Sequence, residues 1–161
     1  MRYDSVMSKL TFRLTSTAAV LAIALGGVLA TGFAKESKKK VVAPAGSRPS
    51  PNFSAGIQFE NTLYVSGQTG SDPKTQKVPE KFEDEVQQCL DNIGGVLHAG
   101  GMDFSDAVSV QVYLTDMDLF PRMNSVYTQV FKDPRPTRTA VGVTKLAGAG
   151  AHVEITVTAR K

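Results

Sequence analysis

The sequence predicts an α+β fold in which two helices pack on one face of a mixed β-sheet. The chain has 161 residues, which is enough for one domain with a buried core. Its 42% hydrophobic and 20% charged residues exclude a disordered chain and a multi-span membrane protein. Strand-like and helix-like segments follow one another in the order ββαβαββ. Helices that cover one side of a sheet are the economical arrangement for this order.

The first elements are predicted from turn residues and from the spacing of apolar side chains. Residues 56–60 and 63–66 are two short strands separated by a two-residue turn. Residues 67–79, which are rich in Gly, Asp and Pro, are predicted to be a loop. Apolar side chains then recur at helical spacing until Gly100 ends the helix. The apolar stripe of this helix consists of Phe82, Val86, Cys89, Leu90, Ile93 and Leu97.

The second half of the chain predicts two strands, a helix and the last strand. Residues 108–114 and 153–159 alternate apolar and polar side chains, as expected of strands with one buried face. Residues 120–131 have helical spacing, and Val141 and Val143 suit a strand that follows Arg138. A sheet covered on one side leaves its other face to be buried, and symmetric self-association is a common solution.

The positive charge of the chain lies in its first 40 residues. The net charge is +3, from 18 basic and 15 acidic residues. Residues 1–40 hold seven of the basic and two of the acidic residues, so residues 41–161 carry 11 basic against 13 acidic side chains. The folded part therefore has no electrostatic footprint for nucleic acid, and no nucleic-acid partner is expected.

The N-terminus has the pattern of a targeting segment. A basic start precedes an apolar run over residues 18–30, and small residues flank Phe33 in an A-x-A-like cleavage pattern. We expect a signal peptide over residues 1–34 and a periplasmic or secreted protein. The alternative is an uncleaved segment that anchors the chain in the inner membrane. Residues 35–52, with several prolines, are predicted to be a linker, and residues 53–161 the folded domain.

Few residues are available for metal or cofactor binding. The chain has one cysteine, Cys89, and two histidines, His98 and His152, without a metal-ligand partner at useful spacing. It has neither a phosphate-binding loop nor a dinucleotide-binding glycine pattern. No metal and no cofactor are expected.

Motifs spread over about 110 residues resemble the reactive intermediate deaminase (YjgF) family. They are Ser66-Gly67-Gln68, Gln88, Asn92-Ile93, Leu97, Asp106-Ala107-Val108, Tyr113-Leu114-Thr115-Asp116-Met117, Asn124, Val126-Tyr127, Pro136-Thr137-Arg138-Thr139-Ala140-Val141 and Val153-Glu154-Ile155. The resemblance implies a chorismate-mutase-like protomer and a homotrimer with sites between subunits. It also implies cofactor-free hydrolysis of enamine and imine forms of 2-amino acids, such as 2-aminoacrylate and 2-iminopropanoate, to 2-oxo acids and ammonia.

Arg138 and Glu154 are the catalytic candidates in this resemblance. A guanidinium binds a carboxylate through two parallel hydrogen bonds, which suits the carboxylate of an imino acid at Arg138. The family's matching glutamate positions the attacking water and exchanges protons, which implies the same role for Glu154. The alternative for Glu154 is a structural ion pair or hydrogen bond across the trimer interface.

The resemblance implies five further residues at the substrate. Ser66 and Gly67 match cleft positions at a strand end, and Asn124 matches a cleft residue on the second helix, although a satisfied structural role is equally open. Phe53 stands where many family members carry a tyrosine, so a hydroxyl contact is lost. Ala140 replaces a frequent cysteine at a position that contributes mainly backbone.

Two alternative functions remain at this stage. One is a ligand-binding or stress-protective trimer on the same scaffold, which binds small carboxylates without turnover. The other is RNA cleavage, an activity sometimes attached to the family. The acidic balance of residues 41–161 and the absence of a paired-histidine site argue against RNA cleavage.

Overall fold

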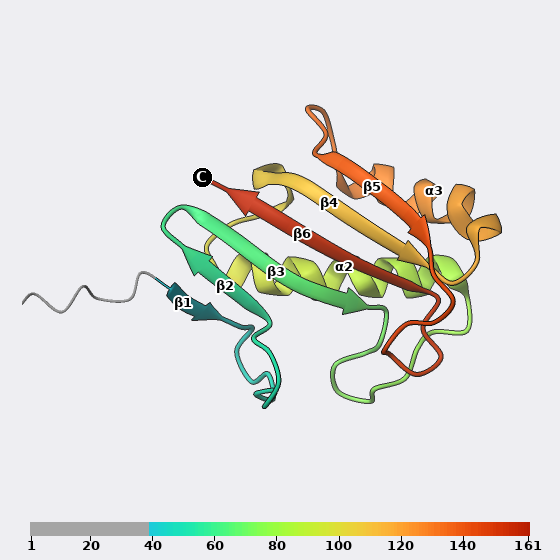
Figure 1. Ribbon diagram of the computed structural model, residues 1–161, viewed down its shortest axis with the longest axis horizontal. Helices are drawn as coiled ribbons and strands as arrows, with labels where there is room; N and C mark the ends of the chain where they lie inside the picture. Colours follow the sequence, from blue (N-terminus) through green and yellow to red (C-terminus); the bar gives the residue numbers. More distant parts are fainter. Residues whose placement is uncertain (1–38) are drawn as a thin grey trace, which may run out of the picture. The chain divides into compact units, whose positions relative to one another are not determined.

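A computed structural model describes residues 39–161 of this protein. Six strands form one sheet in the order β1-β2-β3-β6-β4-β5 (Figure 1). Neighbouring strands are antiparallel, except that β4 and β5 are parallel. The strands and α-helices are β1 (Lys39–Val42), β2 (Gly56–Phe59), β3 (Thr62–Thr69), α2 (Phe82–Ala99), β4 (Ala107–Leu114), α3 (Phe120–Val130), β5 (Thr137–Gly142) and β6 (Val153–Arg160), and two short 3-10 helices precede β4 and α3.

Both helices lie on the same face of the sheet (Figure 1). We call this the helix face and the opposite one the open face, which no other described element covers. The core lies between the helix face and the helices, and all six apolar positions predicted for α2 are buried in it. Val153, Ile155, Val157 and Ala159 of β6 are fully buried, as their alternation predicts. The structure thus confirms the predicted α+β class with two helices on one face of a mixed sheet.

The folded part of the chain begins earlier than the sequence predicts. Lys39–Val42 forms β1, which pairs with β2, and the side chain of Val42 is only 3% exposed. The prediction of a linker over residues 35–52 is therefore wrong for residues 39–42. This strand has only four residues and begins with two lysines, so the sequence shows no strand-like alternation there. Its stability comes from pairing with β2, which lies more than ten residues further along the chain.

Three strand boundaries differ from the prediction for local reasons. β3 continues to Thr69 through an irregularity between Val65 and Gln68, so residues 67–69 are strand rather than loop. A similar shift at the start of β4 leaves Val108 exposed instead of on the buried face, because a bulge inserts one extra residue. β5 contains Arg138 rather than following it.

The predicted signal peptide, residues 1–34, lies outside the described residues. Among residues 39–161, no helix is long and apolar enough to cross a membrane.

An ion pair joins the two helices. Nε and Nη2 of Arg122 on α3 donate to the two carboxylate oxygens of Glu83 on α2 at 2.7 and 2.9 Å. The guanidinium also lies over the ring of Phe82, 5.4 Å from its centroid. These hydrogen bonds lower the pKa of Glu83 from its ordinary 4.5 to about 2. The pair therefore links folding stability to pH.

We expect Arg122→Ala to remove a stabilisation that depends on ionised Glu83. A carboxyl group whose pKa is lowered by folding stabilises the folded state above its ordinary pKa, and that contribution is lost as pH falls towards the folded pKa. The variant should melt below wild type at pH 6, and the two melting temperatures should converge as the pH falls towards about 2. Circular dichroism melts across this range measure the difference. A difference that is the same at both ends would contradict the assignment.

Candidate functional site

Arg138 is held by three side chains of α3. It lies in β5 opposite the buried Val110, so its side chain projects to the helix face. Nη1 donates to Oδ1 of Asn124 at 2.7 Å. The guanidinium carbon lies 4.6 Å from the ring centroid of Tyr127 and 5.3 Å from that of Phe120. These contacts fix the plane of the guanidinium group.

The anchored guanidinium keeps hydrogen-bond donors for a ligand. An arginine side chain has five N–H donors, and Asn124 accepts from Nη1 alone. Within residues 39–161, no acidic side chain forms an ion pair with Arg138. Arg138 is also exposed. This arrangement is that of a positioned anion-binding group.

Tyr127 and Phe120 are two further residues of this site for which the sequence predicts no role. Phe120, Asn124 and Tyr127 are spaced by four and three residues, which places them on one face of α3. This helical spacing relative to Asn124 is the sequence feature that indicates a shared site for Phe120 and Tyr127. The hydroxyl of Tyr127 is buried and has no hydrogen-bond partner among the described residues. Burial raises the pKa of Tyr127, and the nearby charge of Arg138 opposes this rise.

Glu154 lies on the open face of the sheet. Its neighbours Val153 and Ile155 are fully buried on the helix face, so the side chain of Glu154 projects to the other side. It is partly buried there, opposite Tyr113 of β4 and Thr69 of β3. No hydrogen bond or ion pair to another residue of the described segment is found for this carboxylate, which leaves it available.

The carboxylate of Glu154 lies directly against Gly67. A Cβ added at Gly67 would stand 2.0 Å from Oε1 of Glu154, closer than any two such atoms can approach. Only glycine therefore lets the carboxylate occupy this position. Gly67 sits in the irregularity of β3, so the bulge and the absent side chain together make the place for Glu154.

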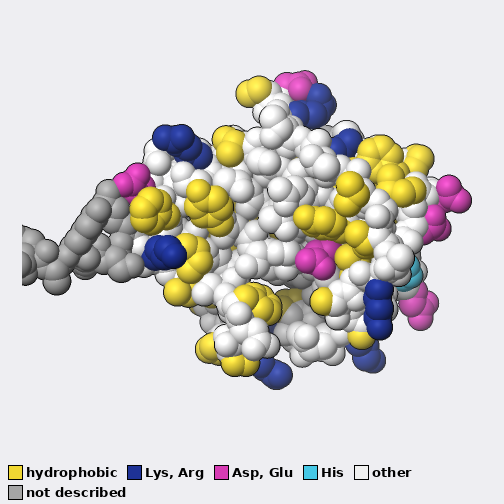
Figure 2. Space-filling model, viewed as in Figure 1, with side chains coloured by type: hydrophobic (Ala, Val, Ile, Leu, Met, Phe, Trp, Pro, Cys, Tyr) yellow, Lys and Arg dark blue, Asp and Glu magenta, His cyan; other side chains and the backbone are white. Residues whose placement is uncertain are grey.

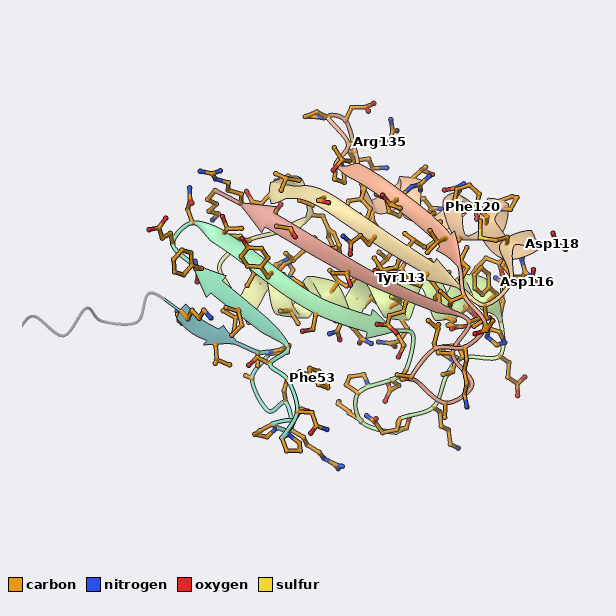
Figure 3. The ribbon with its side chains drawn as sticks, viewed as in Figure 1. Phe53, Tyr113, Asp116, Asp118, Phe120 and Arg135 are labelled. Carbon is orange, nitrogen blue, oxygen red and sulfur yellow. The ribbon has the colours of Figure 1, made fainter. Side chains whose placement is uncertain are left out.

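Ser66 fastens the segment that carries Phe53. Its hydroxyl donates to the carbonyl oxygen of Ser54 at 2.7 Å, and its N–H donates to that of Ala55 at 2.9 Å. With its hydrogen used in this way, the hydroxyl has only acceptor capacity left for a ligand. Phe53 itself is 60% exposed and lies on the loop before β2, far from Phe120 in Figure 3.

Five of the seven predicted site residues form two groups on opposite faces of the sheet. Arg138 projects from the edge strand β5 to the helix face, where it meets Asn124 of α3. Ala140 is the register partner of the buried Val112, so its side chain also projects to the helix face. Glu154 lies on the open face with Gly67 beside it. A single chain therefore does not bring Arg138 and Glu154 together on one ligand.

The cysteine and His98 lie outside this site and have structural roles. Cys89 is buried, its thiol donates to the carbonyl oxygen of Gln68 at 3.0 Å, and burial raises its pKa. His98 is in the last turn of α2. In the part of the chain that the structure describes, no three His, Cys, Asp or Glu side chains are grouped as metal ligands.

The fold and the site define a class of protein with one sheet, two helices on one face and an anchored arginine at the sheet edge. Residues 45–161 match the family described as Endoribonuclease L-PSP. The 2-iminobutanoate/2-iminopropanoate deaminase of Mus musculus is 40% identical over 114 residues, which are 70% of this chain and 82% of the mouse protein. The chain therefore belongs to the YjgF, or reactive intermediate deaminase, family, as the sequence resemblance predicts.

Solved structures agree with this assignment. The crystal structure of the YjgF gene product from E. coli has a TM-score of 0.70 and 27% sequence identity, and the match covers 76% of this chain and 98% of that one. The structure of E. coli TdcF with bound serine has a TM-score of 0.68 and 28% identity, covering 76% and 99% of the two chains. The chorismate-mutase-like α+β fold predicted from the resemblance is confirmed.

Proposed function

We propose that this protein hydrolyses enamine and imine forms of 2-amino acids to 2-oxo acids and ammonia. The observation that carries the proposal is Arg138, a guanidinium fixed by Asn124, Tyr127 and Phe120 with donors left for a carboxylate. The name of the mouse relative and the serine bound to the E. coli relative support an amino-acid-like ligand. The acidic balance of residues 41–161 supports a small-molecule substrate rather than RNA.

Two positioned groups are enough for this reaction. 2-Aminoacrylate takes a proton from solvent at C3 and becomes 2-iminopropanoate with a protonated C=N bond. Water then adds to C2 of the protonated C=N bond, and Glu154 takes the proton that the water loses. The same carboxyl returns this proton to nitrogen. As the C–N bond breaks and ammonia leaves, the hydroxyl at C2 gives its proton to the Glu154 carboxylate, and C2 becomes the carbonyl of the 2-oxo acid. Arg138 holds the substrate carboxylate throughout.

We further propose that the working site is shared between subunits of a homotrimer. Arg138 and Glu154 project to opposite faces of one sheet, so a second chain must supply one of them to a common ligand. The open face also carries exposed apolar side chains over several strands (Figure 2). Val41, Phe59, Tyr64 and Val141 are among them. A contact between copies would bury these side chains.

The direct test is a deaminase assay with a panel of imino acids generated in place. The processed protein is mixed with 2-aminoacrylate or 2-iminobutanoate, and the 2-oxo acid is followed against the reaction in buffer. We expect an acceleration that depends on protein concentration. No acceleration with any substrate of the panel would contradict the proposed reaction.

Binding without turnover is the second candidate. Phe53 favours it, because its ring brings no hydroxyl to a ligand. A small carboxylate would then raise the melting temperature of the protein while the 2-oxo acid forms no faster than in buffer.

We also propose that the protein works outside the cytoplasm, in the periplasm or secreted, after cleavage behind Ala34. The basic start, apolar run and small residues of the first 34 positions support this. Amino-terminal sequencing of the exported protein tests the proposal. A chain that keeps Met1 in a membrane fraction would instead support the anchored alternative.

Gly67→Ala should lower the deaminase kcat through Glu154. The new methyl group would occupy the place of Oε1, and the carboxylate must move by at least about 1 Å, a misplacement that costs up to about 100-fold. Steady-state kinetics of this variant in the wild-type and Glu154→Gln backgrounds measure the effect. The two losses should not add, because both act on one carboxylate. Additive losses would contradict this prediction.

A further inference from the structure

Glu85 is a fully buried carboxylate that the reaction described above does not use. It lies in the first turn of α2 and is 0% exposed. One oxygen, Oε1, accepts the backbone N–H of His152 at 2.6 Å and that of Val153 at 3.2 Å. The other, Oε2, lies 2.8 Å from Nδ1 of His152. A buried carboxylate satisfied in this way fixes the groups that bind it.

The side chain of Glu85 also lies against Gly70, the residue that follows β3. A Cβ at Gly70 would stand 2.4 Å from Cγ of Glu85, so the chain closes tightly over this side chain. Nearby on α2, Asn92 donates to the carbonyl oxygens of Thr69 and Ser71 at 3.0 and 2.9 Å. Helix α2 therefore holds the end of β3 and the start of β6 with polar side chains.

These two strand ends flank Glu154. Glu154 follows Val153 directly in β6, and its register partner in β3 is Thr69. A displacement of the backbone at residues 152 and 153 would also move Glu154, because it is the next residue in the same strand. We infer that Glu85, with His152, is a positioning residue that sets the place of the Glu154 carboxylate.

His152 completes this arrangement from the solvent side. Its side chain is 55% exposed, while its Nδ1 faces the buried oxygen of Glu85. The 2.8 Å contact between Nδ1 and Oε2 holds the imidazole ring in one orientation. The inference rests on the proposed function, because the role it gives Glu85 is to serve Glu154 in the deaminase reaction.

The kinetic test compares Glu85→Asp, Glu85→Gln and His152→Ala with wild type. Glu85→Asp shortens the side chain and should lower kcat about tenfold with KM within about twofold, because Arg138 lies on a different strand. Glu85→Gln keeps an acceptor for both N–H groups and should recover most of kcat. His152→Ala should lose about threefold in kcat by releasing one of the three contacts. The matched control is Glu83→Gln, on the same helix turn but outside this contact, with kcat unchanged.

A second measurement does not depend on turnover. With ¹³C-labelled glutamate, the side-chain carboxyl resonance of Glu154, assigned through Glu154→Gln, should shift in Glu85→Asp and His152→Ala and stay in place in Glu83→Gln. If the Glu154 resonance shifts but the wild-type protein has no deaminase activity, the positioning role is retained and only the proposed function is refuted. If Glu85→Asp does not fold, His152→Ala decides, with Glu85→Gln as the conservative variant that should stay near wild type. Unchanged kcat together with an unmoved resonance in the folded variants would overturn the inference.

Discussion

Replacing Arg138 with alanine is expected to lower kcat/KM for an imino acid about 100-fold, mainly through KM. Two parallel charge-assisted hydrogen bonds contribute about 3 kcal/mol, which corresponds to this factor. The guanidinium is already fixed by Asn124 and by the rings of Tyr127 and Phe120, so little freedom is lost on binding. Initial rates of 2-oxo acid formation over a range of substrate concentrations measure both constants.

Two variants separate this role from a general loss of charge. Arg138→Lys keeps the charge but loses the planar pair of donors, and should fall between alanine and wild type. Arg135→Ala removes a nearby exposed arginine that pairs with Asp133 at 2.5 Å, and should match wild type. If Arg138→Ala and wild type accelerate the reaction equally, Arg138 is not the substrate anchor.

Replacing Glu154 with glutamine is expected to lower kcat about 100-fold and leave KM almost unchanged. The substitution conserves size but removes the group that takes and returns the proton, and such groups contribute about 100-fold or more. The carboxylate has no partner among the described residues, so its loss should break no structural contact and the melting temperature should stay near that of wild type. The measurement is the initial rate of 2-oxo acid formation at saturating substrate, from which the rate of the reaction in buffer is subtracted to give kcat.

The control for Glu154 is Glu80→Gln, an exposed glutamate just before α2. It should keep full activity. A normal kcat in Glu154→Gln would contradict the catalytic role. A large fall in its melting temperature would instead support the structural ion pair or hydrogen bond between subunits that the sequence leaves open.

The sequence predicts the parts of the fold that depend on local periodicity. The apolar stripe of α2 and the alternation of β6 identify both elements and their buried faces. What it misses depends on distant pairing. β1 is stabilised by β2, and the exposure of Val108 follows from a bulge against β6. Neither feature leaves a pattern within its own few residues.

The candidate site is predictable as a set of residues but not as a geometry. Arg138, Glu154, Ser66, Gly67, Phe53, Asn124 and Ala140 come from the family resemblance, and their roles stay predictions. The contact of Gly67 with Glu154 and the stacking of Arg138 on Tyr127 need the folded chain to become visible. The division of the two catalytic candidates between opposite faces follows from strand register, which the sequence pattern of the weakly alternating β5 does not reveal.

The central claim is that Arg138 and Glu154 act on one substrate from two different subunits. The most direct measurement mixes unfolded Arg138→Ala and Glu154→Gln chains in equal amounts and refolds them together. Each variant alone is nearly inactive, but random mixing gives about a quarter of the inter-subunit sites both native side chains. We expect the mixture to recover up to about a quarter of wild-type activity. Activity no higher than that of the separate variants, in mixed oligomers shown to have formed, would contradict a shared site.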